Sequence, residues 1–134
     1  MNRYYILDPR NQPVPASQDE EERWRRENPD RLQVALTTGH LPWAKNAEVD
    51  VSTAFIGLRH TYPPGIFETK VFLGSLENDD QDLTFRCNTW EEAELQHHRV
   101  LAALGLTPDG RYMGQVNWGL QAVVLHAQLN HKRP

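Results

Sequence analysis

The stretch from Val51 to Leu104 constrains the fold more than any other part of the chain. It contains two β-prone runs, VSTAFIGLRH and IFETKVFLG, which are joined by the turn sequence TYPPG. A third β-prone run, LTFRCN, leads into the helical pattern TWEEAELQHHRVLAAL. This order predicts a hairpin, a third strand and a helix that covers them.

The covering helix has clear signals at both ends. Thr89 and Glu92 have the spacing of an N-terminal capping box, and Gly105 is a typical C-terminal stop. Apolar positions repeat at helical spacing, so we expect one face of this helix to lie on the sheet. The residues of this face are Trp90, Ala93, His97, Val100, Leu101 and Leu104.

The two strands of the hairpin can be aligned through their turn. If His60 pairs with Ile66, then Arg59 faces Phe67 and Leu58 faces Glu68. A shift by one residue would exchange the two faces, so the alignment decides which side chains meet. In this alignment one face carries Phe55, Phe67, Thr69 and Val71, and the other carries His60, Glu68 and Lys70 beside Ile56 and Leu58.

The chain begins with a short strand pattern and a proline-rich connector. Residues 4–7 (YYIL) favour a strand. Pro9, Pro13 and Pro15 follow, and they argue against regular structure in the connector.

A capped helix and a second strand pattern come next. Ser17 and Glu20 have capping-box spacing, and Asn28-Pro29 ends the helix. Trp24 is its one large apolar residue, so we expect it to hold the helix to the surface of the domain. The run LQVALTT then alternates as a strand does, and residues 39–46 are expected to form a loop. Leu32, Val34 and Leu36 are expected on one face of that strand.

A single α+β domain is predicted for the 134 residues, with residues 105–134 as a C-terminal extension. Its architecture should be an antiparallel sheet of about five strands packed by two or three helices. Residues 112–129 fit a helix and a strand alike, and the Leu, Ala and Gln of WGLQAVVLHAQL favour the helix.

Composition narrows the class of function. The net charge of −4 argues against a nucleic-acid binder, and no apolar run approaches the roughly 20 residues that span a bilayer. The first residues lack the apolar core of a signal peptide, and Cys87 is the one cysteine. We therefore expect a cytoplasmic protein without a disulfide.

Three segments resemble a family of small proteins encoded by bacteriophages and prophages. They are VSTAFIGL with His60, FETKVF, and TWEEAELQH from Thr89, which together span residues 51–100. The family pattern is close to VSTVFLGLDH, a short Gly/Pro loop, FETMVF and TWEEA with a later His. This chain has Arg59 where the pattern has Asp and Lys70 where it has Met. The resemblance implies a phage origin rather than a mechanism.

Two sets of polar residues are candidates for chemistry. In the predicted alignment His60 and Glu68 share a face with Lys70, and a His beside a carboxylate can act as a general base. The alternative is an exposed cross-strand ion pair, which we favour. A metal site would require His40, His60 and His97 to converge, and we expect none, because the metal-ligand spacings of known motifs are missing from the sequence. No cofactor is expected either.

Binding is favoured over catalysis as the function. Trp43, Arg59, His60 and Tyr62 could meet at the rim of the hairpin, and aromatic residues with Arg are typical of binding hot spots. We therefore expect a phage-type accessory protein that binds a host bacterial protein or a small ligand. The alternative is a small hydrolase or nuclease that uses His60 and Glu68.

Overall fold

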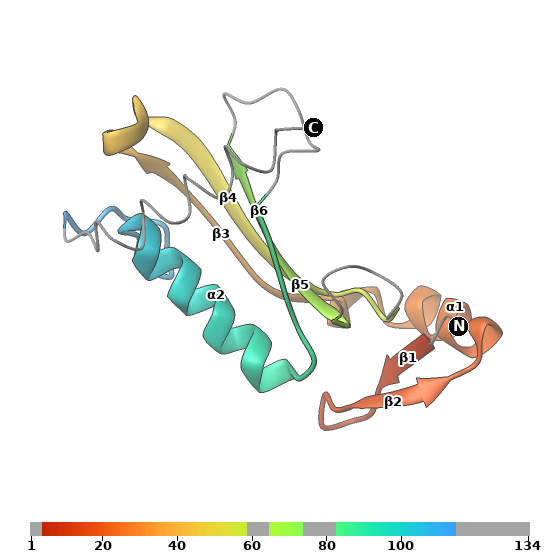
Figure 1. The fold of residues 1–134 in the computed structure, drawn as a ribbon. Helices are drawn as coiled ribbons and strands as arrows, with labels where there is room; N and C mark the ends of the chain where they lie inside the picture. The colour runs from red at the N-terminus through yellow and green to blue at the C-terminus, as the bar shows by residue number, and fades with distance from the viewer. Residues whose placement is uncertain (1–3, 59–64, 74–82, 115–134) are drawn as a thin grey trace, which may run out of the picture.

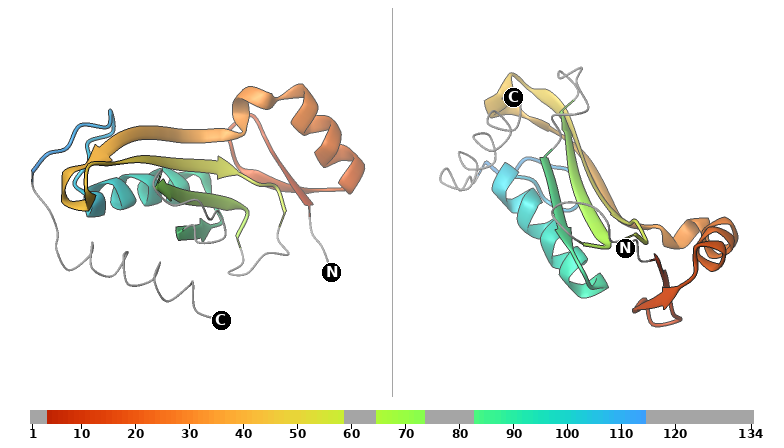
Figure 2. Two further views of the ribbon diagram at one scale, coloured as in Figure 1. Left: turned by 90° about the horizontal axis from the view of Figure 1, so that it is seen from above. Right: turned by 45° about the vertical axis from the view of Figure 1, so that its right-hand side comes forward.

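Two antiparallel sheets and two α-helices make up the described part of the fold, which confirms the predicted α+β class. The computed structural model describes residues 4–58, 65–73 and 83–114. Its six strands form one sheet of two and one of four, in the order β3-β4-β5-β6, where about five strands were predicted. α2 lies along one face of the larger sheet, and α1 with the smaller sheet lies at one end (Figure 1, Figure 2). The strands are β1 (Tyr4–Leu7), β2 (Pro13–Ala16), β3 (Gln33–Leu41), β4 (Ala47–Phe55), β5 (Phe67–Leu73) and β6 (Leu83–Cys87). The helices are α1 (Gln18–Glu27) and α2 (Trp90–Leu104), with the 3-10 turns η1 (Pro29–Arg31) and η2 (Pro42–Ala44).

The central hairpin of β4 and β5 forms, but with a different alignment from the predicted one. Phe67 pairs with Phe55 instead of Arg59, which is a shift of four residues along β4. Because this shift is an even number, Phe55 and the side chains of β5 keep their predicted faces. Phe55, Phe67, Thr69 and Val71 are buried on the side of the sheet that α2 covers.

β4 was predicted to run to His60, and it ends at Phe55 because the chain turns there to meet β1. Gly57 has a left-handed φ of 68°, which favours glycine, and its carbonyl accepts a hydrogen bond of 2.9 Å from the Tyr5 amide. Leu58 then forms an isolated antiparallel bridge with Tyr4. The smaller sheet is thus attached to the end of the larger one through the backbone.

A shift of register near the start of β3 puts some of its side chains on the face opposite to the predicted one. The pairing with β4 shifts within residues 33–35, so the alternation of inward and outward side chains changes phase. Leu36, which was predicted to share a face with Leu32 and Val34, is 58% exposed. Leu41, which was assigned to a loop, belongs to the strand and is 1% exposed. The second half of the strand therefore supplies its fully buried positions, whereas Val34 in the first half is only partly buried, against the cluster of Phe55 and Ala93.

β2 contradicts the prediction that prolines exclude regular structure from the connector. Pro13 pairs with Leu7 and Pro15 pairs with Tyr5 in the two-stranded sheet. The two prolines are two residues apart, so both nitrogens point to the same edge of the ribbon. Among the described strands β2 pairs with β1 alone, so that edge requires no N–H donor for a further strand.

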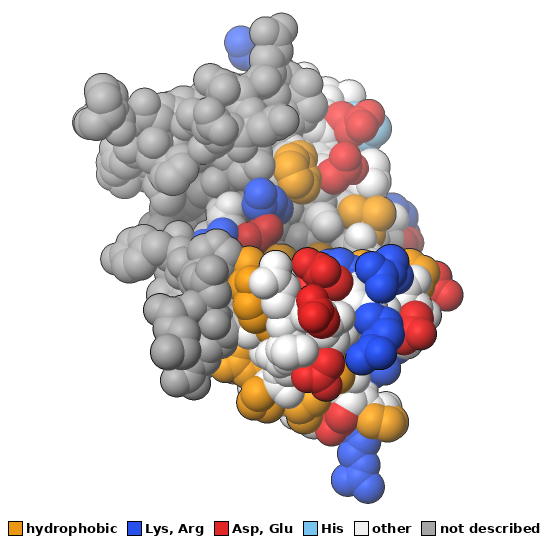
Figure 3. All heavy atoms as spheres, turned by 90° about the vertical axis from the view of Figure 1, so that its right-hand side faces the viewer, with side chains coloured by type: hydrophobic (Ala, Val, Ile, Leu, Met, Phe, Trp, Pro, Cys, Tyr) orange, Lys and Arg blue, Asp and Glu red, His pale blue; other side chains and the backbone are white. Residues whose placement is uncertain are grey.

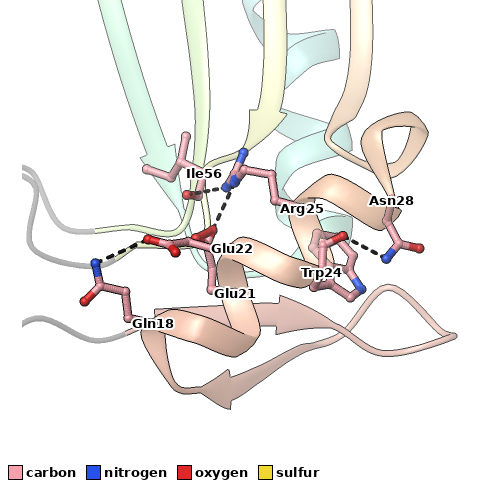
Figure 4. Close-up of polar contacts among 7 residues, drawn as sticks. All are labelled: Gln18, Glu21, Glu22, Trp24, Arg25, Asn28 and Ile56. Carbon is pink, nitrogen blue, oxygen red and sulfur yellow. Dashed lines mark hydrogen bonds and ion pairs between the residues drawn. The ribbon is translucent and has the colours of Figure 1, made fainter.

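α1 has the predicted capping box of Ser17 and Glu20, and it is attached to the end of β4 by more than Trp24. The Trp24 ring meets Phe55 edge to face, with centroids 5.6 Å apart. Arg25 Nη2 donates to the Ile56 carbonyl at 2.8 Å, and its Nε donates to Glu21 at 3.0 Å (Figure 4). The Arg25 guanidinium, which is held by Glu21 of the same helix, therefore positions α1 together with the Trp24 ring.

α2 confirms the prediction for the covering helix. Thr89 caps its N-terminus by accepting from the Glu92 amide, and Gly105 ends it with φ of 85°. Leu101 and Leu104 are buried in a core with Val51 and Val71, and half-buried Trp90 meets Phe67 at 6.2 Å. The buried residues of α2 are Ala93, His97, Val100, Leu101, Ala103 and Leu104.

Residues 115–134, which carry most of the segment predicted to be either helix or strand, lie outside the described residues. Across the parts that the structure describes, neither helix combines the length and the apolar character that a membrane span requires.

The change of phase in β3 predicts unequal costs for two leucine substitutions in the same strand. Leu41→Ala should lower the free energy of unfolding by about 2–5 kcal/mol, because it leaves a cavity in the core. Leu36→Ala should change it by less than about 0.5 kcal/mol, because that side chain lies in solvent. Urea denaturation of both variants measures the difference. A larger loss for Leu36→Ala than for Leu41→Ala would mean that the alternation in β3 continues unchanged from Leu32.

Candidate functional site

The structure does not bring Trp43 to the hairpin rim. Trp43 lies in η2, between β3 and β4, and its Nε1 donates to the Leu104 carbonyl at 3.0 Å. The nine residues of β4 separate it by roughly 30 Å from the other end of that strand, where Leu58 and Gly65 lie. Trp43 is half-buried and packs on the core beneath α2. Its side chain therefore covers the core, and its role in binding stays a prediction.

Arg59, His60 and Tyr62 lie outside the described residues, so their place at the rim also stays a prediction. Glu68 is described, and it lies opposite Ala54 rather than Leu58. Its Oε2 accepts from Arg86 Nη2 at 2.8 Å and Nε at 3.1 Å, and its Oε1 lies 3.6 Å from Lys70 Nζ. The carboxylate is thus held in a largely buried cross-strand ion pair with Arg86 of β6, a partner that the sequence did not predict. The predicted pairing with His60 lies outside the described residues.

The described histidines do not converge on a metal site. His40 is exposed on β3, whereas His97, on α2, is buried between that helix and the sheet. Thr37, Gly39 and Leu41 face the core, so His40 lies on the opposite face of the sheet from His97. In residues 4–58, 65–73 and 83–114, no group of three or more His, Cys, Asp or Glu is placed to hold a metal ion.

His97 is the centre of a buried hydrogen-bond network between α2 and the sheet. Its Nε2 lies 3.0 Å from Thr37 Oγ1 on β3, and its Nδ1 lies 2.8 Å from Thr53 Oγ1 on β4. Thr53 Oγ1 lies 2.8 Å from Thr69 Oγ1 on β5, which donates to Gln96 Oε1 at 3.1 Å. We call these five residues the Thr–His network.

A backbone carbonyl fixes which ring nitrogen of His97 carries hydrogen. Thr37 Oγ1 lies 2.9 Å from the Pro108 carbonyl, which can only accept a hydrogen bond. The single hydroxyl proton of Thr37 is used there, so Thr37 must accept from His97 Nε2. The ring therefore has hydrogen on Nε2 in every protonation state of this arrangement.

Burial lowers the pKa of His97, and the neighbouring His98 lowers it further. The two rings are 6.3 Å apart, and the His97 side chain is 3% exposed. A lowered pKa makes the neutral ring the main form at neutral pH. The ring is also kept from direct contact with a dissolved substrate, so its first role is to join α2 to three strands.

Beside this network a groove of about 640 Å³ lies between β6 and α2. It has the size of a ligand site, and its surface is largely apolar. Gln96 lines the groove and also belongs to the Thr–His network. We call it the β6–α2 groove; the lining residues that matter here are Phe85, Cys87, Leu95, Gln96, Arg99 and Ala102.

Most polar groups of the β6–α2 groove are already engaged. Burial raises the pKa of the Cys87 thiol to about 11, and the nearby Glu92 carboxylate adds to this, so the thiol is protonated at neutral pH. Glu92 accepts from the Thr89 hydroxyl at 3.0 Å, and Arg86 is held by Glu68. Arg99 is exposed at the groove. The groove is therefore suited to holding a ligand and poorly suited to nucleophilic attack by its cysteine.

A second exposed surface, the outer face of α1, carries both signs of charge. Figure 3 shows acidic and basic side chains interspersed on this side of the molecule. The exposed charged residues of α1 include Glu20, Glu22, Arg23 and Arg26. Binding of nucleic acid by this face is not favoured, because it would require a basic stripe.

The sequence placed His97 on the helix face that lies on the sheet, and the structure confirms this. The sequence pattern indicated neither Gln96 nor Thr37 as a member of this network. The available signal was a threonine at an inward position on each of three strands. Which of these hydroxyls reach one ring depends on the alignment of the strands, and that alignment was predicted incorrectly.

Comparison with known protein families, with characterised proteins and with solved structures gave no match. The resemblance to small phage and prophage proteins therefore stays a prediction.

The buried neutral His97 predicts a loss of stability in acid. The unfolded chain binds a proton near the ordinary histidine pKa of 6.5, whereas the folded pKa is lower. Stability is therefore fully present above pH 6.5 and falls as the pH drops toward the folded pKa, by at most about 1.4 kcal/mol per pH unit. Urea denaturation across this range should show the slope, and His97→Gln should reduce it. An unchanged slope in that variant would assign the acid sensitivity to another group.

Proposed function

We propose that the protein acts by binding and that the β6–α2 groove receives an extended segment of a partner protein. The observation that supports this most strongly is the groove itself, a largely apolar hollow of about 640 Å³ between β6 and α2. Apolar grooves of this kind commonly bind peptide segments of partner proteins.

β6 forms one wall of the groove. It pairs with β5 and is the last strand in the described order of the larger sheet. Phe85 and Cys87 on this strand line the groove. A segment that lies along β6 would direct alternate side chains toward α2.

The lining supports a partner segment with an apolar side chain and an acidic one. Phe85, Leu95 and Ala102 offer apolar surface, and Leu95 is 49% exposed. Apolar surface of this kind gains roughly 25 cal/mol per Å² when it is covered. Arg99 supplies positive charge that can pair with a carboxylate.

The resemblance to phage proteins supports a host bacterial protein as the partner, met in the host cytoplasm. The rim residues Arg59, His60 and Tyr62 stay part of the proposal as a second contact surface, and Trp43 stays a candidate for a third. No contact of the described residues favours the alternative of catalysis, because Glu68 is held by Arg86 and Lys70.

Filling the groove should abolish binding. Ala102 is exposed and lines the groove, so Ala102→Trp should block it without disturbing the core. Capture from bacterial lysate should identify a stoichiometric protein whose affinity falls about tenfold or more in this variant. Titration calorimetry with synthetic peptides tiled over that protein should then locate one extended segment whose binding is also lost in Ala102→Trp.

Glu94→Trp is the matched control, because Glu94 is exposed on α2 but does not line the groove. It should keep wild-type binding. A partner that binds Ala102→Trp normally contradicts the groove, and loss on Arg59→Ala or Tyr62→Ala alone assigns binding to the rim instead. Nuclear Overhauser contacts from residues 116–129 to Ala102 in the free protein would also overturn the proposal, because the chain itself would then fill the groove.

A further inference from the structure

The direction of the hydrogen bonds in the Thr–His network depends on how the Gln96 amide is turned. With Oε1 toward Thr69, Thr69 must donate to Gln96 and accept from Thr53. Thr53 has then used its only proton and must accept from His97 Nδ1. Because Nε2 already donates to Thr37, this arrangement requires hydrogen on both ring nitrogens.

The opposite turn of the amide requires a neutral ring. If the Gln96 NH2 group donates to Thr69, then Thr69 donates to Thr53 and Thr53 donates to His97 Nδ1. All contacts of the network are again satisfied, with one proton fewer. Each protonation state of His97 therefore selects one orientation of Gln96, because a buried hydrogen-bonding group without a partner is costly.

Gln96 links the protonation state of the buried His97 ring to the groove. One terminal atom of its amide faces Thr69, so the other is the one left for a ligand in the β6–α2 groove. When His97 is protonated, the groove side of the amide is the NH2 donor. When His97 is neutral, it is the carbonyl acceptor.

We propose that a ligand atom which accepts a hydrogen bond from Gln96 is bound together with a proton on the ring of His97. The inference rests on the proposed binding function of the groove. The ligand group would be a carboxylate or a backbone carbonyl of the bound segment. Affinity for such a group rises as the pH falls, and a bound acceptor raises the pKa of His97 by the same free energy.

Among the described residues, no side chain that is bonded to the His97 ring carries a charge. β3, β4 and β5 present the hydroxyls of Thr37, Thr53 and Thr69 to α2. On α2 the titratable neighbours in the described part of the chain are His98 and exposed Glu94, and exposed Asp109 follows Pro108. The Cys87 thiol on β6 is neutral at these pH values.

Nuclear magnetic resonance of the free protein tests the coupling without any partner. In Gln96→Glu the carboxylate can only accept from Thr69, so it should favour the doubly protonated ring. The ¹⁵N shifts of the His97 ring should therefore give a titration midpoint about one pH unit higher than in the wild type. Wild-type protein should show hydrogen on Nε2 at every pH.

Leu95→Glu is the matched control, because it adds the same charge one residue away on an exposed side chain outside the network. It should raise the midpoint clearly less than Gln96→Glu. Combining Gln96→Glu with Thr69→Val breaks the chain of hydroxyls and should reduce the shift to the level of Leu95→Glu. Equal shifts in all three variants would overturn the inference, because the effect would then be charge alone.

Butyrate tests the ligand side, because it joins a carboxylate to a short apolar chain. Its dissociation constant, followed through the Gln96 side-chain amide signals, should be several-fold lower at about pH 6 than at about pH 8 in the wild type. In Thr69→Val it should vary clearly less with pH. If the ring titration behaves as expected but butyrate binding is independent of pH, the coupling to ligand is wrong while the proposed groove function stands. If no partner segment binds in the groove, the proposed function of the groove is wrong, but the titration of the His97 ring still tests the hydrogen-bond network.

Discussion

One buried side chain holds the covering helix over the sheet at a fixed position. His97 uses both ring nitrogens to bond threonine hydroxyls on two neighbouring strands, and a third strand is joined through Thr53 and Thr69. Apolar packing of residues such as Leu101 drives α2 onto the sheet but does not by itself fix its position along the strands. Directed hydrogen bonds in a buried place do fix it, since an unpaired partner there is costly.

The position of α2 in turn creates the groove. The helix reaches β3, β4 and β5 through the network, and the space of about 640 Å³ lies on its other side, next to β6. Gln96 belongs both to the Thr–His network and to the lining of the β6–α2 groove, so one residue takes part in helix packing and in the proposed binding surface. The smaller sheet and α1 are attached at the end of β4 through Gly57, Trp24 and Arg25. They also contact the start of α2, where Gln12 donates to Glu91.

The sequence predicted those features that depend on local signals. The limits of α2 follow from Thr89 and Gly105, and the buried face of β5 follows from simple alternation. It failed where the structure depends on distant contacts: the change of phase in β3 exposes Leu36, and the turn at Gly57 follows from pairing with β1. For the candidate site the buried role of His97 was predicted, but the groove was not, because it exists only once helix and edge strand are placed.

The coupling energy between His97 and Thr53 tests the central claim most directly. Urea denaturation of His97→Leu, Thr53→Val and the double variant gives this energy as a double-mutant cycle. If the ring positions α2 through its hydrogen bonds, the coupling should be about 1–3 kcal/mol. A coupling near zero would contradict the claim and leave apolar packing as the force that sets the helix on the sheet.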